Sequence, residues 1–170
     1  MDLTRFIRDI PDFPKPGIVF KDITPLLAEP RAFHYAVERL AEHYVHHEIQ
    51  VVASAEARGF LFAAPLALRL NKPLVPLRKP GKLPYKTHAL RYDLEYGSAE
   101  LQLHIDAIEP GARVLLLDDV LATGGTMEAS CRLIAQAGGK TIGCAFLIEL
   151  MFLGGREKLR PCEVFSLLQY

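Results

Sequence analysis

The fold of this chain is decided by the stretch from Val114 to Met127, which reads VLLLDDVLATGGTM. Its four leading aliphatic residues predict a strand that is buried on both faces and ends at the paired carboxylates Asp118 and Asp119. Beyond the two glycines, apolar residues at Met127, Cys131 and Ile134 follow the spacing of one helical face. The stretch therefore predicts a strand, a loop and a helix in succession.

A loop of this kind is suited to binding an anion. Free backbone N–H groups and the positive end of the helix dipole meet at the carboxyl edge of the sheet. Gly124 and Gly125 let the backbone approach a phosphate closely, while Thr123 and Thr126 offer hydroxyl donors. Because the acids upstream can accept hydrogen bonds from hydroxyls, the pattern is typical of a sugar phosphate site, most simply for ribose 5-phosphate. A polar turn without a ligand is the alternative.

Two other phosphate loops are excluded by the residues present. No lysine follows the glycines, as the P-loop of nucleotide triphosphatases requires, and the three-glycine dinucleotide fingerprint is absent.

Composition narrows the class of protein. The chain has 170 residues, of which half are hydrophobic, so we expect one domain with a substantial core. Its 20 basic and 20 acidic residues cancel, which argues against nucleic acid as a partner. Three cysteines without metal-site spacing are expected to be reduced core thiols. No apolar run is long enough to cross a bilayer and no signal peptide is recognisable, so no membrane partner and a cytoplasmic location are predicted.

The segment before residue 25 combines rigidity with apolar side chains. Three prolines between Pro11 and Gly17 predict a stiff loop. Ile18, Val19 and Phe20 follow, and they could form either the wall of a pocket or part of the ordinary core.

A helix is predicted to begin at Pro30 and to carry four histidines. His43 and His47 are four residues apart, so a metal site must be considered. Because the sequence shows neither a third ligand nor a His-Glu-x-x-His pattern, a solvated helix face is the preferred interpretation.

A second strand-to-helix loop follows the predicted strand at residues 51–53. The planar guanidinium of Arg58 in this loop would give paired donors to a diphosphate. The alternative is a local surface ion pair between Glu56 and Arg58.

A polar segment from Arg78 to Gly97 follows an expected strand at residues 74–77, in which Pro76 indicates either the end of the strand or a sheet edge. Leu101, Leu103 and Ile105 alternate with polar residues as in a strand, so the segment is predicted to be a hairpin or lid. A lid could close over a bound ligand and exclude water, whereas a solvated loop is the alternative. With further strands at 141–148 and 164–168, the chain predicts an α/β fold: a central, mostly parallel sheet with helices on both faces.

These motifs together resemble the type I phosphoribosyltransferases. Beside VLLLDDVLATGGTM, the resemblance rests on PDFP at 11–14, PGIVFKDITP at 16–25, EARGFLF at 56–62, RKPGKLP at 78–84 and LEYG at 94–97. It spans nearly the whole chain and is closest to the members that use adenine. It implies one domain over residues 1–170, with a small N-terminal hood at about 11–25 and a flexible lid at about 78–97.

The resemblance also implies an activity. This is transfer of the 5-phosphoribosyl group from 5-phosphoribosyl 1-diphosphate to adenine, giving AMP and diphosphate in purine salvage. Magnesium is expected as the cofactor, held mainly through substrate and water rather than by protein ligands, and a homodimer is expected. Transfer to another base and a regulator without turnover are the alternatives.

Residue roles follow from the same resemblance. Phosphoribose binding is expected from Asp118, Asp119, Ala122, Thr123, Gly124, Gly125 and Thr126, and diphosphate binding from Arg58, Arg78 and Lys82. Adenine is expected to contact Val19, Phe20, Lys21 and Leu150, while Glu95 and Arg58 are the expected catalytic residues and Tyr96 belongs to the lid. Ser54 and Ala63 stand where relatives often have glycine, and Ser54 is expected to narrow the second loop.

Overall fold

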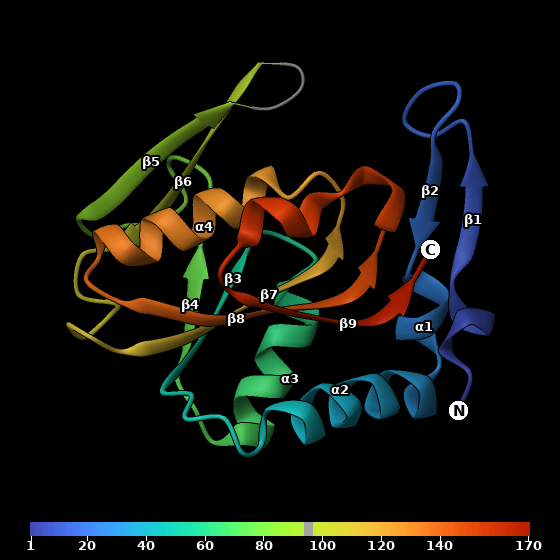
Figure 1. The fold of residues 1–170 in the computed structure, drawn as a ribbon, viewed down its shortest axis with the longest axis horizontal. Helices are drawn as coiled ribbons and strands as arrows, with labels where there is room; N and C mark the ends of the chain where they lie inside the picture. The colour runs from blue at the N-terminus through green and yellow to red at the C-terminus, as the bar shows by residue number, and fades with distance from the viewer. Residues whose placement is uncertain (94–96) are drawn as a thin grey trace.

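Five parallel strands form the central sheet in the computed structural model of the chain, which describes residues 1–93 and 97–170 (Figure 1). Their order across the sheet is β4 (Leu74–Leu77), β3 (Val51–Ala55), β7 (Arg113–Leu121), β8 (Lys140–Glu149) and β9 (Glu163–Gln169). The central position of β7 explains its run of buried aliphatic residues, because both of its edges are paired and both of its faces are covered. Pro76 is tolerated because β4 is an edge strand.

Helices cover both faces of this sheet. Figure 1 shows α2 (Pro30–Tyr44) and α3 (Phe60–Leu70) on one face and α4 (Gly125–Gln136) on the other. Successive side chains of β7 alternate between them, as a strand requires. Leu115 and Leu117 belong to the core beneath α2 and α3, whereas Val114 and Leu116 belong to the core beneath α4. The predicted α/β fold is thereby confirmed.

Two strands continue through residues at which the sequence predicts a loop. β7 does not end at the paired acids but includes them and continues to Leu121, which pairs with Glu149 of β8. The strand continues past the charges because β8 pairs with β7 as far as Glu149. Likewise β3 runs to Ala55, so that Ser54 lies inside a strand rather than in the following loop.

Two antiparallel hairpins stand apart from the central sheet. One is formed by β1 (Arg8–Pro11) and β2 (Val19–Asp22), and the other by β5 (Thr87–Asp93) and β6 (Ser98–His104). Figure 1 shows both projecting in the same direction at opposite ends of the molecule. Leu101 and Leu103 are buried as the alternation predicts, but Ile105 lies beyond the end of β6 and is 41% exposed. The predicted continuation of the strand to Ile105 is therefore wrong, because the chain turns after His104.

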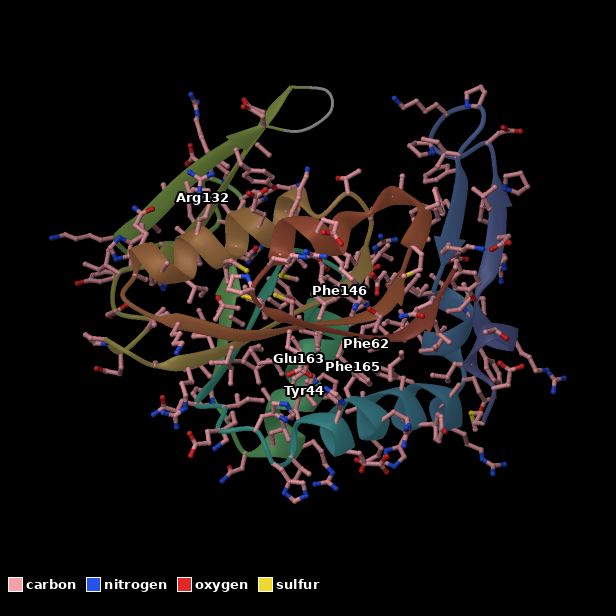
Figure 2. The ribbon with its side chains drawn as sticks, viewed as in Figure 1. Tyr44, Phe62, Arg132, Phe146, Glu163 and Phe165 are labelled. Atoms are coloured by element: carbon pink, nitrogen blue, oxygen red, sulfur yellow. The ribbon has the colours of Figure 1, made fainter. Side chains whose placement is uncertain are left out.

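Short helices complete the chain. They are η1 (Leu3–Phe6), α1 (Thr24–Ala28), η2 (Met151–Leu153) and η3 (Gly155–Leu159). Tyr44 and Phe62 are among the largest fully buried side chains, and both lie in the core shared by α2, α3 and the sheet (Figure 2). Within the described part of the chain, no helix has the length and apolar character needed to cross a membrane.

Candidate active site

Residues 122–124 form the loop that joins the end of β7 to the start of α4. Gly124 has a φ of 82°, in the left-handed region, and a Cβ there would collide with the carbonyl oxygen of Gly155. Only glycine fits this position. At Gly125, by contrast, the nearest atom to an added Cβ is the carbonyl oxygen of Asp93, 3.9 Å away. The first turn of α4 thus presents open space to an incoming group, beside a cavity of about 90 Å³ that the loop lines together with Phe146.

The two acids lie at this edge in a largely buried setting. Asp119 is only 4% exposed, and its backbone N–H donates a 2.8 Å hydrogen bond to Oδ1 of Asp118. Burial, reinforced by the negative charge of Asp119, raises the pKa of Asp118 well above its usual range. Burial also raises the pKa of Asp119, although Arg58 opposes the shift. Oδ2 of Asp119 is buried and accepts no hydrogen bond within the described residues, although it makes an ion pair with Arg58.

Arg58 connects the acids to the N-terminal hairpin. Its Nε lies 2.9 Å from Oδ2 of Asp119 in an ion-pair contact, and its guanidinium carbon lies 4.9 Å above the ring centre of Phe20. Strands β3 and β7 are neighbours, so the residues that follow β3 reach the acids of β7. The side chain of Arg58 is still 42% exposed, which leaves donors for an anion.

Glu56 pairs with Arg78 rather than with Arg58. Its Oε2 accepts a 2.7 Å bond from Nε of Arg78 and a 2.9 Å bond from the backbone N–H of Lys79. Burial acts to raise the pKa of Glu56, yet these bonds and the two cations hold it below its usual range. The local surface pair considered from sequence is therefore not formed. Arg78 is instead oriented by a carboxylate from the neighbouring strand end, since Ala55 and Leu77 are partners in the parallel ladder.

Lys82, the third residue expected at the diphosphate, is exposed on the segment between β4 and β5, and the described residues offer it no ion pair. Ser54 is fully buried, and a Cβ on Gly59 would collide with its Oγ and lie 2.8 Å from Oδ1 of Asp118. The hydroxymethyl group of Ser54 thus occupies space that Gly59 leaves open. The bulk of Ser54, which was expected to narrow the loop after β3, is thus accommodated within β3 itself. Ala63 is likewise buried, within α3.

The β1–β2 hairpin brings the residues expected to bind adenine to the same side of the molecule. Phe20 is half-buried, with Phe13 edge-on at 5.1 Å, while Val19 is 48% exposed. Nζ of Lys21 lies 2.7 Å from Oδ1 of Asp9, so the side chain of Lys21 is already engaged.

On the opposite wall Leu150 follows β8 directly, and its N–H donates a 2.9 Å bond to the carbonyl of Leu121. This bond connects Leu150, which is expected to contact adenine, to the last residue of β7, just before the loop at residues 122–124.

Glu95 and Tyr96 lie outside the described residues. Tyr92 of β5 reaches the first turn of α4, where its hydroxyl lies 3.4 Å from Oγ1 of Thr126. Two further residues shape the site without being among the predicted site residues. They are Glu56, which was considered from sequence only as a partner of Arg58 but orients Arg78, and Gly155, on which Gly124 packs. The Gly154-Gly155 pair after a strand was the available signal for the latter, because consecutive glycines often mark a close backbone approach.

An anion loop after the central strand of a parallel sheet, two buried acids and an arginine from the neighbouring loop define a class of protein. This class is the type I phosphoribosyltransferases, whose ligands lie at the carboxyl ends of the strands.

Comparison with known proteins agrees with this class. Residues 26–163 match the family described as the phosphoribosyl transferase domain. An adenine phosphoribosyltransferase from Rhodopirellula baltica is 57% identical over 170 residues, which are 100% of this chain and 82% of the relative. One from Kosmotoga olearia is 55% identical, with 100% of both chains covered. The crystal structure of the Thermoanaerobacter pseudethanolicus adenine phosphoribosyltransferase superposes with a TM-score of 0.96 at 50% identity, covering 99% of this chain and 98% of that one.

The Saccharomyces cerevisiae adenine phosphoribosyltransferase, solved in complex with adenine and an imino-altritol bisphosphate, has a TM-score of 0.91 at 37% identity, covering 97% and 96% of the two chains. The chain belongs to the adenine phosphoribosyltransferase family.

Proposed function

We propose that this chain transfers the 5-phosphoribosyl group of 5-phosphoribosyl 1-diphosphate to adenine, giving AMP and diphosphate. The observation that carries the proposal is the position of Arg58. Its guanidinium contacts Asp119, the expected sugar ligand, and Phe20, the expected base ligand, at 2.9 and 4.9 Å. The subsites for ribose, diphosphate and base would then meet around Arg58. The carbon C1 of ribose, at which adenine replaces diphosphate, must lie where these subsites meet.

The phosphoribosyl group is held by the segment after β7, residues 122–126, which we call the phosphate loop. The 5-phosphate lies against the N–H groups of residues 123–126, where the open space at Gly125 admits it. The two ribose hydroxyls donate to the carboxylates of Asp118 and Asp119. Support for this assignment comes from the position of both acids in the last part of β7, directly before the loop that lies against the 5-phosphate.

The diphosphate is bound by Arg58, Arg78 and Lys82. The first two guanidiniums are held by Asp119 and Glu56, so their positions are set before the substrate arrives. Carboxylate oxygens are the donors that magnesium prefers, so Asp118 and Asp119 fit a magnesium ion bound mainly through diphosphate and water. That ion would neutralise charge on the leaving diphosphate.

Adenine stacks on Phe20 and is enclosed by Leu150. Its exocyclic amine is read by backbone acceptors at Val19 and Lys21, because the nearby carboxylate of Asp22 already accepts two bonds from Thr24, at 2.9 and 2.8 Å. A base with a carbonyl at that position would place two acceptors face to face, so we expect strong preference for adenine over hypoxanthine.

In the reaction, a ring nitrogen of adenine forms a bond to C1 of the ribose while the C1–O bond to diphosphate breaks, and the proton of that nitrogen is released to the departing diphosphate or to water. The ring oxygen lone pairs support the positive charge that develops at C1. Water must be kept from this carbon, and closure of the β5–β6 hairpin as a lid is proposed to exclude it. For Glu95 and Tyr96 we propose the roles that the resemblance implies. Glu95 is a catalytic residue, and Tyr96 belongs to the lid.

A homodimer and a cytoplasmic location complete the proposal. Support for the dimer comes from Leu61 and Leu68, which lie seven residues apart on one face of α3 and are 42% and 83% exposed. Light scattering on the chain and on Leu68→Glu tests it: an unchanged dimer in the variant would place the interface elsewhere.

The activity is tested by following diphosphate release with adenine, hypoxanthine or guanine in the presence of magnesium. We expect turnover efficiency with adenine to exceed that with hypoxanthine by a factor on the order of 10⁴, as polar mismatch predicts. Comparable use of hypoxanthine would refute the choice of base, and absence of release with every base would refute the transferase activity.

A further inference from the structure

A second group of polar side chains lies at the opposite edge of the sheet from the phosphate loop. It consists of His43 near the end of α2, His47 in the following turn and Glu163 at the start of β9. The amino ends of parallel strands share one edge, so this group is separated from the substrate subsites by the length of the sheet. We call it the His-Glu cluster. Figure 2 labels Glu163 beside Tyr44, on the α2 side.

The structure supplies the third group that the sequence lacked. Oε1 of Glu163 lies 2.8 Å from Nε2 of His43, and Oε2 lies 3.3 Å from Nε2 of His47. The three residues each offer one ligand atom, and these atoms all lie within 4.8 Å of one another. The expectation of a simple solvated helix face at His43 and His47 is therefore wrong, because a strand 116 residues further along the chain returns to them.

Aromatic packing fixes the orientation of the first imidazole. The ring of His43 stacks on Phe165 at 3.7 Å with an interplanar angle of 7°, and Tyr44 meets it edge-on at 4.7 Å. Phe165 is two residues beyond Glu163 and therefore projects from the same face of β9. One strand thus provides both a ligand and the support for a second ligand, which is the kind of preorganisation that a metal site needs.

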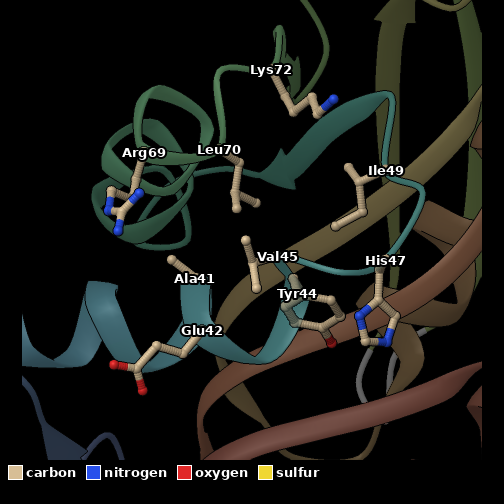
Figure 3. Close-up of a pocket in the computed structure, with 9 residues that line it drawn as sticks. All are labelled: Ala41, Glu42, Tyr44, Val45, His47, Ile49, Arg69, Leu70 and Lys72. Atoms are coloured by element: carbon tan, nitrogen blue, oxygen red, sulfur yellow. The ribbon is translucent and has the colours of Figure 1, made fainter.

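The cluster is also accessible to solvent. His43, His47 and Glu163 have side chains that are 29%, 33% and 46% exposed. His47 and Tyr44 line a cavity of about 290 Å³ next to the end of α2 (Figure 3). Nε2 of both imidazoles faces the carboxylate of Glu163, and Nδ1 of His47 is buried without a partner among the described residues.

We infer that the His-Glu cluster is a binding site for a zinc ion, with Nε2 of His43, Nε2 of His47 and a carboxylate oxygen of Glu163 as its protein ligands. Two imidazoles and one carboxylate suit zinc, which prefers four ligands, and water completes the set. Each Nε2 binds in its unprotonated form, with the ring proton on Nδ1 in the neutral imidazole. The bound ion ties the end of α2 to the start of β9.

One other group of side chains could capture zinc and must be separated in the test. Sγ of Cys131 and Sγ of Cys144 are 3.8 Å apart, and Cys162 lies within 4.8 Å of both. Cobalt(II) distinguishes the two sites, because thiolate ligands give intense sulfur-to-metal charge-transfer absorption that nitrogen and oxygen ligands lack. A Cys131→Ser, Cys162→Ser double variant removes the softer site while leaving the His-Glu cluster intact.

The experiment titrates zinc into chelator-treated full-length chain by calorimetry and cobalt by absorption spectroscopy. Glu163→Gln and His47→Gln remove one ligand each, and His46→Gln, at an exposed neighbouring histidine, is the matched control. Circular dichroism and AMP titration verify that each variant is folded. If His47→Gln fails to fold, Glu163→Gln decides, because glutamine keeps the shape of the side chain.

We expect one saturable zinc site per chain, weakened at least about 100-fold in both ligand variants, since even outer-shell changes cost 10- to 100-fold. Affinity should be unchanged in His46→Gln and in the cysteine variant, and the cobalt spectrum should lack thiolate charge transfer. The inference would be overturned by any of three results: unchanged zinc affinity in Glu163→Gln and His47→Gln, loss of zinc binding in the cysteine double variant, or no saturable zinc binding at all. The His-Glu cluster would then be an ion pair that binds no metal.

Discussion

Replacing Asp118 by asparagine should change AMP affinity and the stability of the protein in opposite directions. The substitution keeps the shape of the side chain and an Oδ1 that can still accept the 2.8 Å bond from the N–H of Asp119. It removes a largely buried negative charge that lies next to a second acid. Two opposite effects are expected, one on the ligand and one on the fold.

The effect on the ligand is a loss of affinity for AMP. A hydrogen bond from a ribose hydroxyl to a carboxylate contributes roughly 1.5–3 kcal/mol, so its replacement by an amide should weaken AMP by about 10- to 150-fold. Asp119→Asn should weaken it by a similar factor.

The effect on the fold has the opposite sign. A carboxyl whose pKa is raised in the folded protein binds its proton more tightly there than in the unfolded chain. Stability therefore falls as the pH rises from the ordinary carboxyl pKa through the raised one. The amide side chain of the Asp118→Asn variant carries no such charge, so the free energy of unfolding at neutral pH should increase, and the difference from the parent chain should shrink as the pH is lowered.

Calorimetry with AMP and urea unfolding at several pH values between about 5 and 8 measure both effects. Asp106→Asn, an exposed acid in the turn after β6, serves as the matched control and should change neither quantity. Unaltered AMP affinity in Asp118→Asn would refute the ribose assignment. A variant that is less stable than the parent chain at neutral pH would refute the argument from burial.

Three further substitutions test other parts of the site. Gly125→Val should lower AMP affinity but spare adenosine and the fold, because an added Cβ meets open space on the phosphate side; equal losses for both ligands in calorimetry would contradict this. Phe20→Ala should weaken adenine and other bases alike by about 1–3 kcal/mol of stacking, and a change in preference alone would exclude that role. Glu56→Gln should raise the KM for 5-phosphoribosyl 1-diphosphate by about tenfold, or 1.4 kcal/mol, with the KM for adenine unchanged, since it releases Arg78.

Local patterns were sufficient to predict the strand, loop and helix around the phosphate site. The four aliphatic residues from Val114 define a buried strand whatever follows them, and the glycines fix the turn. What local pattern could not give was the end of that strand. Asp118 and Asp119 remain in the ladder because β8 pairs with it as far as Glu149, and such pairing is decided by distant residues.

The partners of charged side chains were predictable only where they are close in sequence. Glu56 and Arg58 are two residues apart, and a pair between them was the natural alternative. The parallel ladder of β3 and β4 instead delivers Arg78 to Glu56, while the ladder of β3 and β7 delivers Asp119 to Arg58. Glu163 could not be assigned to His43 for the same reason, because only the return of β9 brings them together.

The contact of Gly124 with the backbone of Gly155 has a consequence for a chain that is still being synthesised. All residues of the phosphate loop are joined to the chain well before residue 155 is added. Yet the loop rests on that residue, with no room for even one carbon between the two backbones. A nascent chain that ends before η3 therefore lacks the floor of its anion site, and we expect substrate to assist folding only after translation has passed this point.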